Sequence, residues 1–132
     1  MPHQVIEYSA ILEQKMDIDG LVHALHETAA GIDALPLGGL RTRAVAREHY
    51  RIADGDSDNA FINVYLRIAP GRSFEVRKAA GEALFAALTD HVAPVFDSSP
   101  LALSYEIQEL DADLRWKQSN LRDYMAKRAK EA

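Results

Sequence analysis

The chain has 132 residues, of which 48% are hydrophobic and 27% are charged, and its formal net charge is −5 at pH 7. This length is enough for one domain with its own core, without disulfide or metal cross-links. The acidic balance argues against a general nucleic-acid binder, which usually carries a basic excess. The longest apolar runs fall far short of the roughly 18 residues of a membrane span, so no membrane embedding is expected.

Residue types that carry common chemistry are missing or badly spaced. The chain has no cysteine, which excludes disulfides and thiolate catalysis. Its histidines offer only the weak pair His23 and His26, and no HExxH pattern occurs, so no metal site is expected. No glycine-rich nucleotide motif is present, and Gly38-Gly39 is predicted as a turn. No basic and apolar leader is visible at the N-terminus, so a cytoplasmic location is expected.

The first half of the chain predicts a strand, a helix and a second strand. Residues 2–8 are rich in β-formers, whereas residues 10–16 fit a turn or a short helix equally well. Helical spacing of apolar residues predicts a helix over about 18–31, and the Pro and Gly residues of 35–39 end it in a loop. Alternation then predicts a strand over 40–52, with a strongly basic face formed by Arg41, Arg43, Val45, Arg47, His49 and Arg51.

The second half repeats this order. Turn-forming residues 53–59 predict a long antiparallel hairpin between the preceding strand and a strand over 60–69, whose inward residues would be Ile62, Val64, Leu66 and Ile68. Ser73 is placed to cap a second helix. Its apolar stripe is predicted to contain Val76, Ala80, Ala83, Leu84, Ala87, Leu88, His91 and Val95.

Residues 97–100 break the helical pattern, and residues 101–107 alternate as a fourth strand. The predicted fold is therefore α+β, with two tandem β-α-β units (residues 1–53 and 60–110) in one domain that spans residues 1–132. They would form a mixed four-stranded sheet with two helices on one face. Residues 111–132 are predicted as a tail helix, and Trp116 as a packing anchor at a subunit or tail contact.

Pro2 is the first candidate for chemistry. If Met1 is removed, Pro2 carries a free secondary amine, and α-amino groups titrate at roughly 7.7–8.0 in model peptides. Such an amine can act as a general base. Because Val5 and Ile6 would tie the segment into a sheet, the amine would sit at a fixed point of the fold.

Arg41 and Arg72 are the candidates for binding an anion. Arg72 stands where the second helix begins, so its guanidinium and the first N–H groups of the helix can hold one carboxylate together. Arg41 follows the glycine turn, where a ligand can approach the backbone closely. The alternatives are that Arg72 neutralises Glu75 or lies in solvent, and that Arg41 is a solvated charge on an edge strand. The other arginines of the basic face are expected at the surface or at subunit contacts.

Several segments in register resemble the 5-carboxymethyl-2-hydroxymuconate Δ-isomerase family of the tautomerase superfamily, nearly from end to end. The resemblance is carried by Met1-Pro2-His3, Pro36-Leu37-Gly38-Gly39-Leu40-Arg41-Thr42-Arg43, Ala53-Asp54-Gly55, Gly71-Arg72-Ser73, Ala80-Gly81-Glu82-Ala83-Leu84-Phe85 and Leu101-Ala102-Leu103-Ser104-Tyr105-Glu106-Ile107. It implies a tautomerase-like fold and a homotrimer. It also implies an isomerase of an unsaturated 2-hydroxy polycarboxylate in the breakdown of homoprotocatechuate, an aromatic compound, with no cofactor.

The same resemblance implies roles for three residues. Pro2 would be the base, while Arg41 and Arg72 would bind carboxylate and stabilise the enolate. One alternative is a sibling tautomerase, hydratase or dehalogenase acting on another unsaturated acid. A hydratase or dehalogenase would need a carboxylate beside Pro2, for which Glu7 and Glu106 are candidates. The other alternative is a non-catalytic trimeric protein that binds organic acids.

Overall fold

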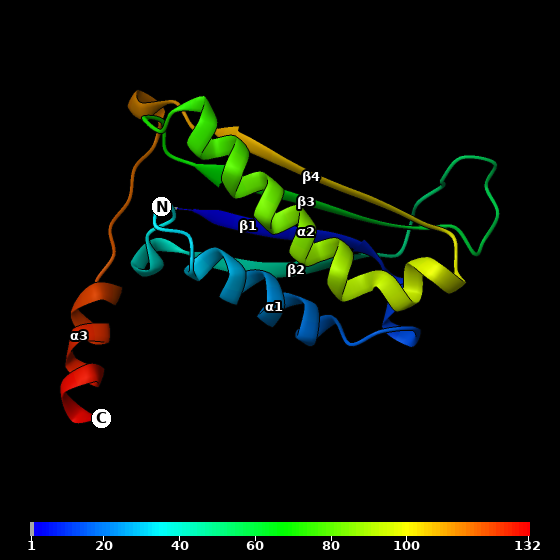
Figure 1. The fold of residues 1–132 in the computed structure, drawn as a ribbon, viewed down its shortest axis with the longest axis horizontal. Coiled ribbons are helices and arrows are strands. Elements are labelled where there is room, and N and C mark those ends of the chain that lie inside the picture. The colour runs from blue at the N-terminus through cyan, green and yellow to red at the C-terminus, as the bar shows by residue number, and fades with distance from the viewer. Residues whose placement is uncertain (1) are drawn as a thin grey trace.

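A computed structural model describes residues 2–132, and its four strands form one mixed sheet in the order β2-β1-β3-β4. β1 pairs in parallel with β2 and antiparallel with β3, and β3 pairs in parallel with β4. Helices α1 and α2 lie on the same face of this sheet (Figure 1), as the sequence predicted. The bounds are β1 His3–Ser9, α1 Ile18–Ala30, β2 Arg41–Arg47, β3 Ala60–Ile68, α2 Phe74–Ser98 and β4 Leu101–Glu109.

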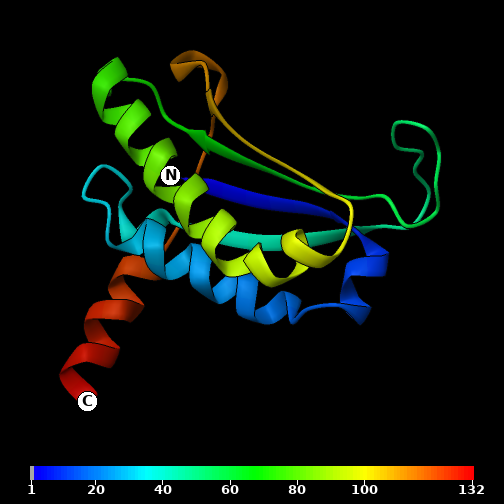
Figure 2. The same cartoon turned by 45° about the vertical axis from the view of Figure 1, so that its right-hand side comes forward.

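The predicted hairpin between the second and third strands is wrong. β1 lies between β2 and β3 and uses both of its edges for hydrogen bonding. β2 also ends at Arg47, before the predicted Ile52. Residues 48–59 form a long loop that leads from one side of β1 to the other and projects from the end of the sheet (Figure 2). The turn-forming residues were interpreted correctly as a loop, but their composition does not determine which strands pair.

The core lies between the sheet and the two helices. Every second residue of β3 is buried, including all four residues predicted to point inward. The buried row of α2 follows steps of four and then three residues, because that spacing keeps side chains on one face of a helix. Three members of the predicted stripe, Val76, Ala83 and His91, are instead exposed. The buried residues of the two helices are Leu21, Leu25 and Ala29 in α1, and Ala80, Leu84, Leu88, Val92 and Val95 in α2.

Short 3-10 turns and a third helix complete the chain. The ambiguous residues 10–16 contain the turn η1 (Ala10–Gln14), and two further turns are η2 (Leu37–Gly39) and η3 (Ala112–Leu114). The tail helix α3 (Leu121–Glu131) extends away from the sheet (Figure 1) and touches η2. Trp116 is 83% exposed, so the tail does not bury it, and its predicted role at a subunit contact stays a prediction. None of the helices among residues 2–132 has both the length and the hydropathy that crossing a membrane requires.

A buried amide anchors the start of β1. Gln4 is fully buried, and its Nε2 donates hydrogen bonds to the Leu25 carbonyl and to Thr42 Oγ1, both at 3.2 Å. Its Oε1 accepts a hydrogen bond from the Tyr105 hydroxyl at 2.8 Å. One side chain therefore links β1 to α1, β2 and β4, two residues after Pro2.

We expect Gln4→Leu to lower the free energy of unfolding by about 1–3 kcal/mol, because it leaves the Tyr105 hydroxyl without its partner inside the protein and removes the amide's hydrogen bonds to the Leu25 carbonyl and Thr42. Urea unfolding of the wild type and the variant measures the difference. Gln118→Leu is the control, since Gln118 is exposed in the tail and should change stability by less than about 0.5 kcal/mol. Equal midpoints for wild type and Gln4→Leu would show that the amide network contributes nothing to stability.

Candidate active site

The parallel register of β1 and β2 brings Pro2 and Arg41 together. His3 lies opposite Arg41, and the Arg41 N–H donates a hydrogen bond to the Pro2 carbonyl at 3.0 Å. Pro2 is buried, and both residues lie at the end of the sheet where Figure 1 marks the N-terminus. Chain termini usually fray unless they are tied to the fold. Here the sheet holds Pro2 in place through the backbone of Arg41.

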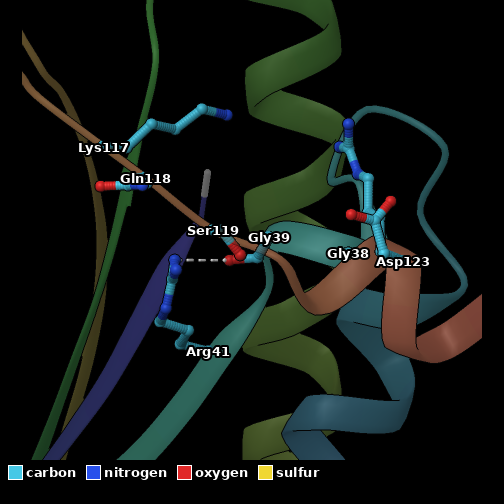
Figure 3. A pocket seen from close by; sticks show the side chains of 8 residues that line it. Gly38, Gly39, Arg41, Lys117, Gln118, Ser119 and Asp123 are labelled. Atoms are coloured by element: carbon cyan, nitrogen blue, oxygen red, sulfur yellow. Dashed lines mark hydrogen bonds between the residues drawn. The ribbon is translucent and has the colours of Figure 1, made fainter.

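The glycine turn orients the Arg41 side chain. η2 ends at Gly39, two residues before Arg41, and Arg41 Nη1 donates a hydrogen bond to the Gly39 carbonyl at 3.1 Å (Figure 3). The side chain is half-buried. Using one nitrogen on the turn leaves the other guanidinium donors of Arg41 available for a ligand.

Arg72 lies in the connection between β3 and α2, at the same end of the sheet as Pro2. β3 runs antiparallel to β1, and its residue Arg67 lies opposite His3. Arg72 Nε donates to the Ala34 carbonyl at 2.7 Å and Nη1 donates to the Ala69 carbonyl at 3.0 Å. Among residues 2–132, no ion pair joins Arg72 to Glu75, so neither that alternative nor a freely solvated side chain describes it. Two carbonyls fix the guanidinium, and its Nη2 remains for a ligand.

The backbone around Arg72 fits this arrangement. Gly71 has φ +119°, a conformation that residues with a Cβ rarely adopt, so glycine allows the chain to turn sharply before Arg72. Ser73 caps α2 as predicted, since its side chain accepts a hydrogen bond from the Val76 N–H at 3.2 Å. Arg72 is therefore held between a turn and a capped helix start.

A cavity of about 410 Å³ lies at the Arg41 side of this end of the sheet. The glycine turn and Arg41 form one wall, and the segment before α3 together with its first residues forms the other (Figure 3). Neither Pro2 nor Arg72 lines it. The structure thus joins Pro2 to Arg41 and places Arg72 at the same end of the sheet, but outside this cavity. Its lining residues are Gly38, Gly39, Arg41, Lys117, Gln118, Ser119, Arg122 and Asp123.

The tail residues of this cavity are missing from the sequence-based prediction. Lys117 and Arg122 belong to a charged tail in which no spacing marks a site, and only the folding of the tail onto η2 brings them to Arg41. The packing is close at Gly38, where a Cβ would lie 2.6 Å from Arg122 Nε and 2.7 Å from its Cγ. A glycine at this position lets the Arg122 side chain lie against the turn.

The other arginines of β2 do not line the cavity. Arg47 is paired with Glu7 at 2.7 Å, and Arg43 Nη1 lies 3.1 Å from His3 Nδ1. Neither Glu7 nor Glu106 lines the cavity beside Arg41. Within residues 2–132, no group of three or more His, Cys, Asp or Glu side chains is arranged to hold a metal ion.

The surroundings of His3 favour its neutral form. Burial and the nearby guanidinium groups of Arg43, Arg41 and Arg67 lower the pKa of His3 below its usual value of 6.5. The contact with Arg43 has the same effect, because Arg43 can donate a hydrogen bond only to an unprotonated Nδ1. The native protein therefore favours neutral His3.

We expect the protein to lose stability as the pH falls through 6.5, where His3 of the unfolded chain takes up a proton that His3 of the folded chain resists. Above that pH both forms are neutral and the effect disappears. Thermal unfolding of wild type and His3→Gln between pH 5 and pH 8 measures it. The variant should show a shallower decline below pH 6.5, whereas identical pH profiles would show that His3 does not contribute.

Comparison with known proteins identifies the family. The sequence profile of a family described as 5-carboxymethyl-2-hydroxymuconate isomerase matches residues 2–125. The chain is 39% identical over 121 residues to the 5-carboxymethyl-2-hydroxymuconate Delta-isomerase of Escherichia coli, a match that covers 92% of this chain and 96% of that protein.

Solved structures agree with this assignment. A 5-carboxymethyl-2-hydroxymuconate isomerase from Deinococcus radiodurans R1 has a TM-score of 0.86 and 39% identity, with 94% of this chain and 93% of that chain covered. The structure of Pt0534 inactivated by 2-oxo-3-pentynoate has a TM-score of 0.66 at 15% identity, with 89% and 93% covered, and shares the fold. The chain therefore belongs to the 5-carboxymethyl-2-hydroxymuconate isomerase family.

Proposed function

We propose that this protein is an isomerase that converts 5-carboxymethyl-2-hydroxymuconate to its 2-oxo-3-ene isomer in the breakdown of aromatic compounds. The observation that carries the proposal is the 39% identity to the Escherichia coli enzyme over 92% of the chain. The backbone hydrogen bond between Pro2 and Arg41 is consistent with it, because it makes the proposed base a neighbour in the sheet of a residue whose side chain can bind an anion.

The proposed base is the amine that Pro2 carries once Met1 is removed. It takes the proton of the 2-hydroxyl group and delivers a proton to C5. The C2=C3 and C4=C5 double bonds are replaced by C2=O and C3=C4, so the atoms balance without any co-reactant. A positioned amine suits both steps, since it is a base in the first and an acid in the second.

Arg41 and Arg72 are the proposed substrate-binding arginines. A guanidinium stays charged and holds a carboxylate through two parallel hydrogen bonds. The carbonyl contacts of both side chains fix their positions before the substrate arrives, which lowers the cost of organising the site. One of the two would also stabilise the negative charge that grows on the 2-oxygen.

We also propose that the protein acts as a cytoplasmic homotrimer of single-domain subunits. Exposed apolar side chains such as Leu114 (70%) and Trp116 (83%) support association. A fused 4-OT protein described as a symmetric trimer shares the fold at 17% identity and a TM-score of 0.57. Sedimentation equilibrium tests the assembly, since a trimer should have about three times the mass of one 14.6 kDa chain.

Product analysis separates the isomerase from the alternatives. Proton NMR of the reaction in water should show the 2-oxo-3-ene isomer and no hydrated product. A hydratase or dehalogenase needs a carboxylate that activates water. Glu7, one of the two candidates for that carboxylate beside Pro2, is instead bound to Arg47. A hydrated product, or binding without turnover, would contradict the proposed function.

A further inference from the structure

The proposed substrate has one carboxylate more than the proposed site has arginines. 5-Carboxymethyl-2-hydroxymuconate carries two carboxylates on its main chain and a third on the arm at C5, whereas the proposed site contains Arg41 and Arg72. Because Pro2 must reach C5 to deliver its proton, the arm at C5 has to lie close to Pro2. The Arg41 N–H is bonded to the Pro2 carbonyl and the Arg41 side chain lines the cavity, so an arm held near Pro2 can extend toward this cavity.

This cavity is rich in positive charge. Arg41, Lys117 and Arg122 line it together with one acidic residue, Asp123, although the whole chain has a net charge of −5. None of the three cations forms an ion pair with another residue of the described chain 2–132. Arg77 on α2, by contrast, is paired with Glu109 at 3.2 Å. The volume of the cavity, about 410 Å³, is in the range of small-molecule sites.

The two cations from the tail differ in what they contact. The Arg122 side chain packs against Gly38 and thereby holds the tail on the glycine turn. Lys117 lies in the extended segment before α3, is exposed, and reaches the cavity (Figure 3). An ammonium on a flexible stem suits a carboxylate on a rotatable arm, because it acts as a point charge and requires no fixed orientation.

We propose that Lys117 is a specificity-determining residue whose ammonium binds the carboxylate of the C5 arm, and that Arg122 positions the segment that carries it. This inference rests on the proposed isomerase function. It predicts that Lys117 distinguishes the tricarboxylate from 2-hydroxymuconate, the dienol that lacks the arm. A hydrogen bond to a charged group, once lost, changes affinity by roughly 10- to 100-fold.

Steady-state kinetics of Lys117→Met on both substrates tests this inference. For the tricarboxylate we expect kcat/KM to fall roughly 10- to 100-fold, mainly because KM rises. For 2-hydroxymuconate we expect kcat/KM to stay within about twofold of the wild-type value. Lys117→Arg should recover most of the loss, because it keeps the charge. Lys130→Met is the matched control, since Lys130 is also exposed in the tail but lies outside the cavity, and it should behave as wild type on both substrates.

Each other result overturns the inference in a different way. Unchanged kinetics of Lys117→Met on the tricarboxylate would refute the role of Lys117 while leaving the isomerase function intact. An equal loss on both substrates would show that Lys117 does not recognise the arm. A wild-type protein that converts neither substrate would refute the proposed function, and the inference with it.

Discussion

A protein with one extra residue before Pro2 should lose about 10²- to 10⁴-fold in turnover of 5-carboxymethyl-2-hydroxymuconate, the contribution that a positioned acid-base group usually makes. Inserting Gly between Met1 and Pro2 leaves a chain that begins with Gly-Pro after processing. The Pro2 nitrogen is then an amide, which cannot accept the proton. The new N-terminal amine belongs to the inserted Gly, one residue before Pro2, whose position is fixed by the hydrogen bond from the Arg41 N–H.

The measurement is kcat for the insertion variant and for the wild type, each with its N-terminus established by intact mass. A glycine added after Ala132 is the control, because it lengthens the chain equally and leaves Pro2 free. The two variants should unfold at the same temperature, so that a difference in turnover reports chemistry and not folding. Full activity of the insertion variant would exclude the Pro2 amine as the base.

Replacing either of the proposed substrate-binding arginines, Arg41 or Arg72, with alanine should reduce turnover by roughly 10²- to 10³-fold, since a positioned donor that stabilises developing negative charge is commonly worth about 2.7–4 kcal/mol. Arg41→Ala removes a guanidinium held at the glycine turn. Arg72→Ala also breaks two hydrogen bonds to the Ala34 and Ala69 carbonyls, so it should cost some stability as well.

Arg47→Ala is the matched control for these variants. It lies on the same strand as Arg41 but at the opposite end, and it is bound to Glu7. Its activity should stay within about twofold of wild type, and its exposed ion pair should contribute little to stability. The kinetics of all three variants, compared with their thermal unfolding, separate loss of chemistry from loss of structure. Equal activity of Arg41→Ala and Arg47→Ala would remove Arg41 from the site.

Local patterns predicted the elements of this fold well and their pairing less well. Alternation along β3 and apolar spacing in α1 identify the buried residues, because burial repeats with the period of the element. The position of β1 between β2 and β3 depends instead on contacts between residues far apart in the chain. Residues 53–59 have the composition of a turn in either arrangement, so they could not show that the predicted hairpin was wrong.

The residues of the candidate site also differ in whether a local sequence pattern can predict them. Pro2, Arg41 and Arg72 stand next to local signals, namely the chain start, a glycine turn and a helix cap. Lys117 has no such signal, and its place beside Arg41 results from the tail packing on Gly38. The exposure of Trp116 has a similar origin, because a tail that extends away from the sheet leaves the tryptophan largely uncovered by the described chain.

The most direct measurement is the ultraviolet decay of 5-carboxymethyl-2-hydroxymuconate with wild-type protein shown by intact mass to begin at Pro2, run in parallel with Pro2→Ala. We expect rapid conversion by the wild type to the 2-oxo-3-ene isomer and a rate at least about 10²-fold lower for the variant, whose primary amine lacks the ring that fixes it. Equal decay with the two proteins, or decay no faster than in buffer, would contradict this expectation.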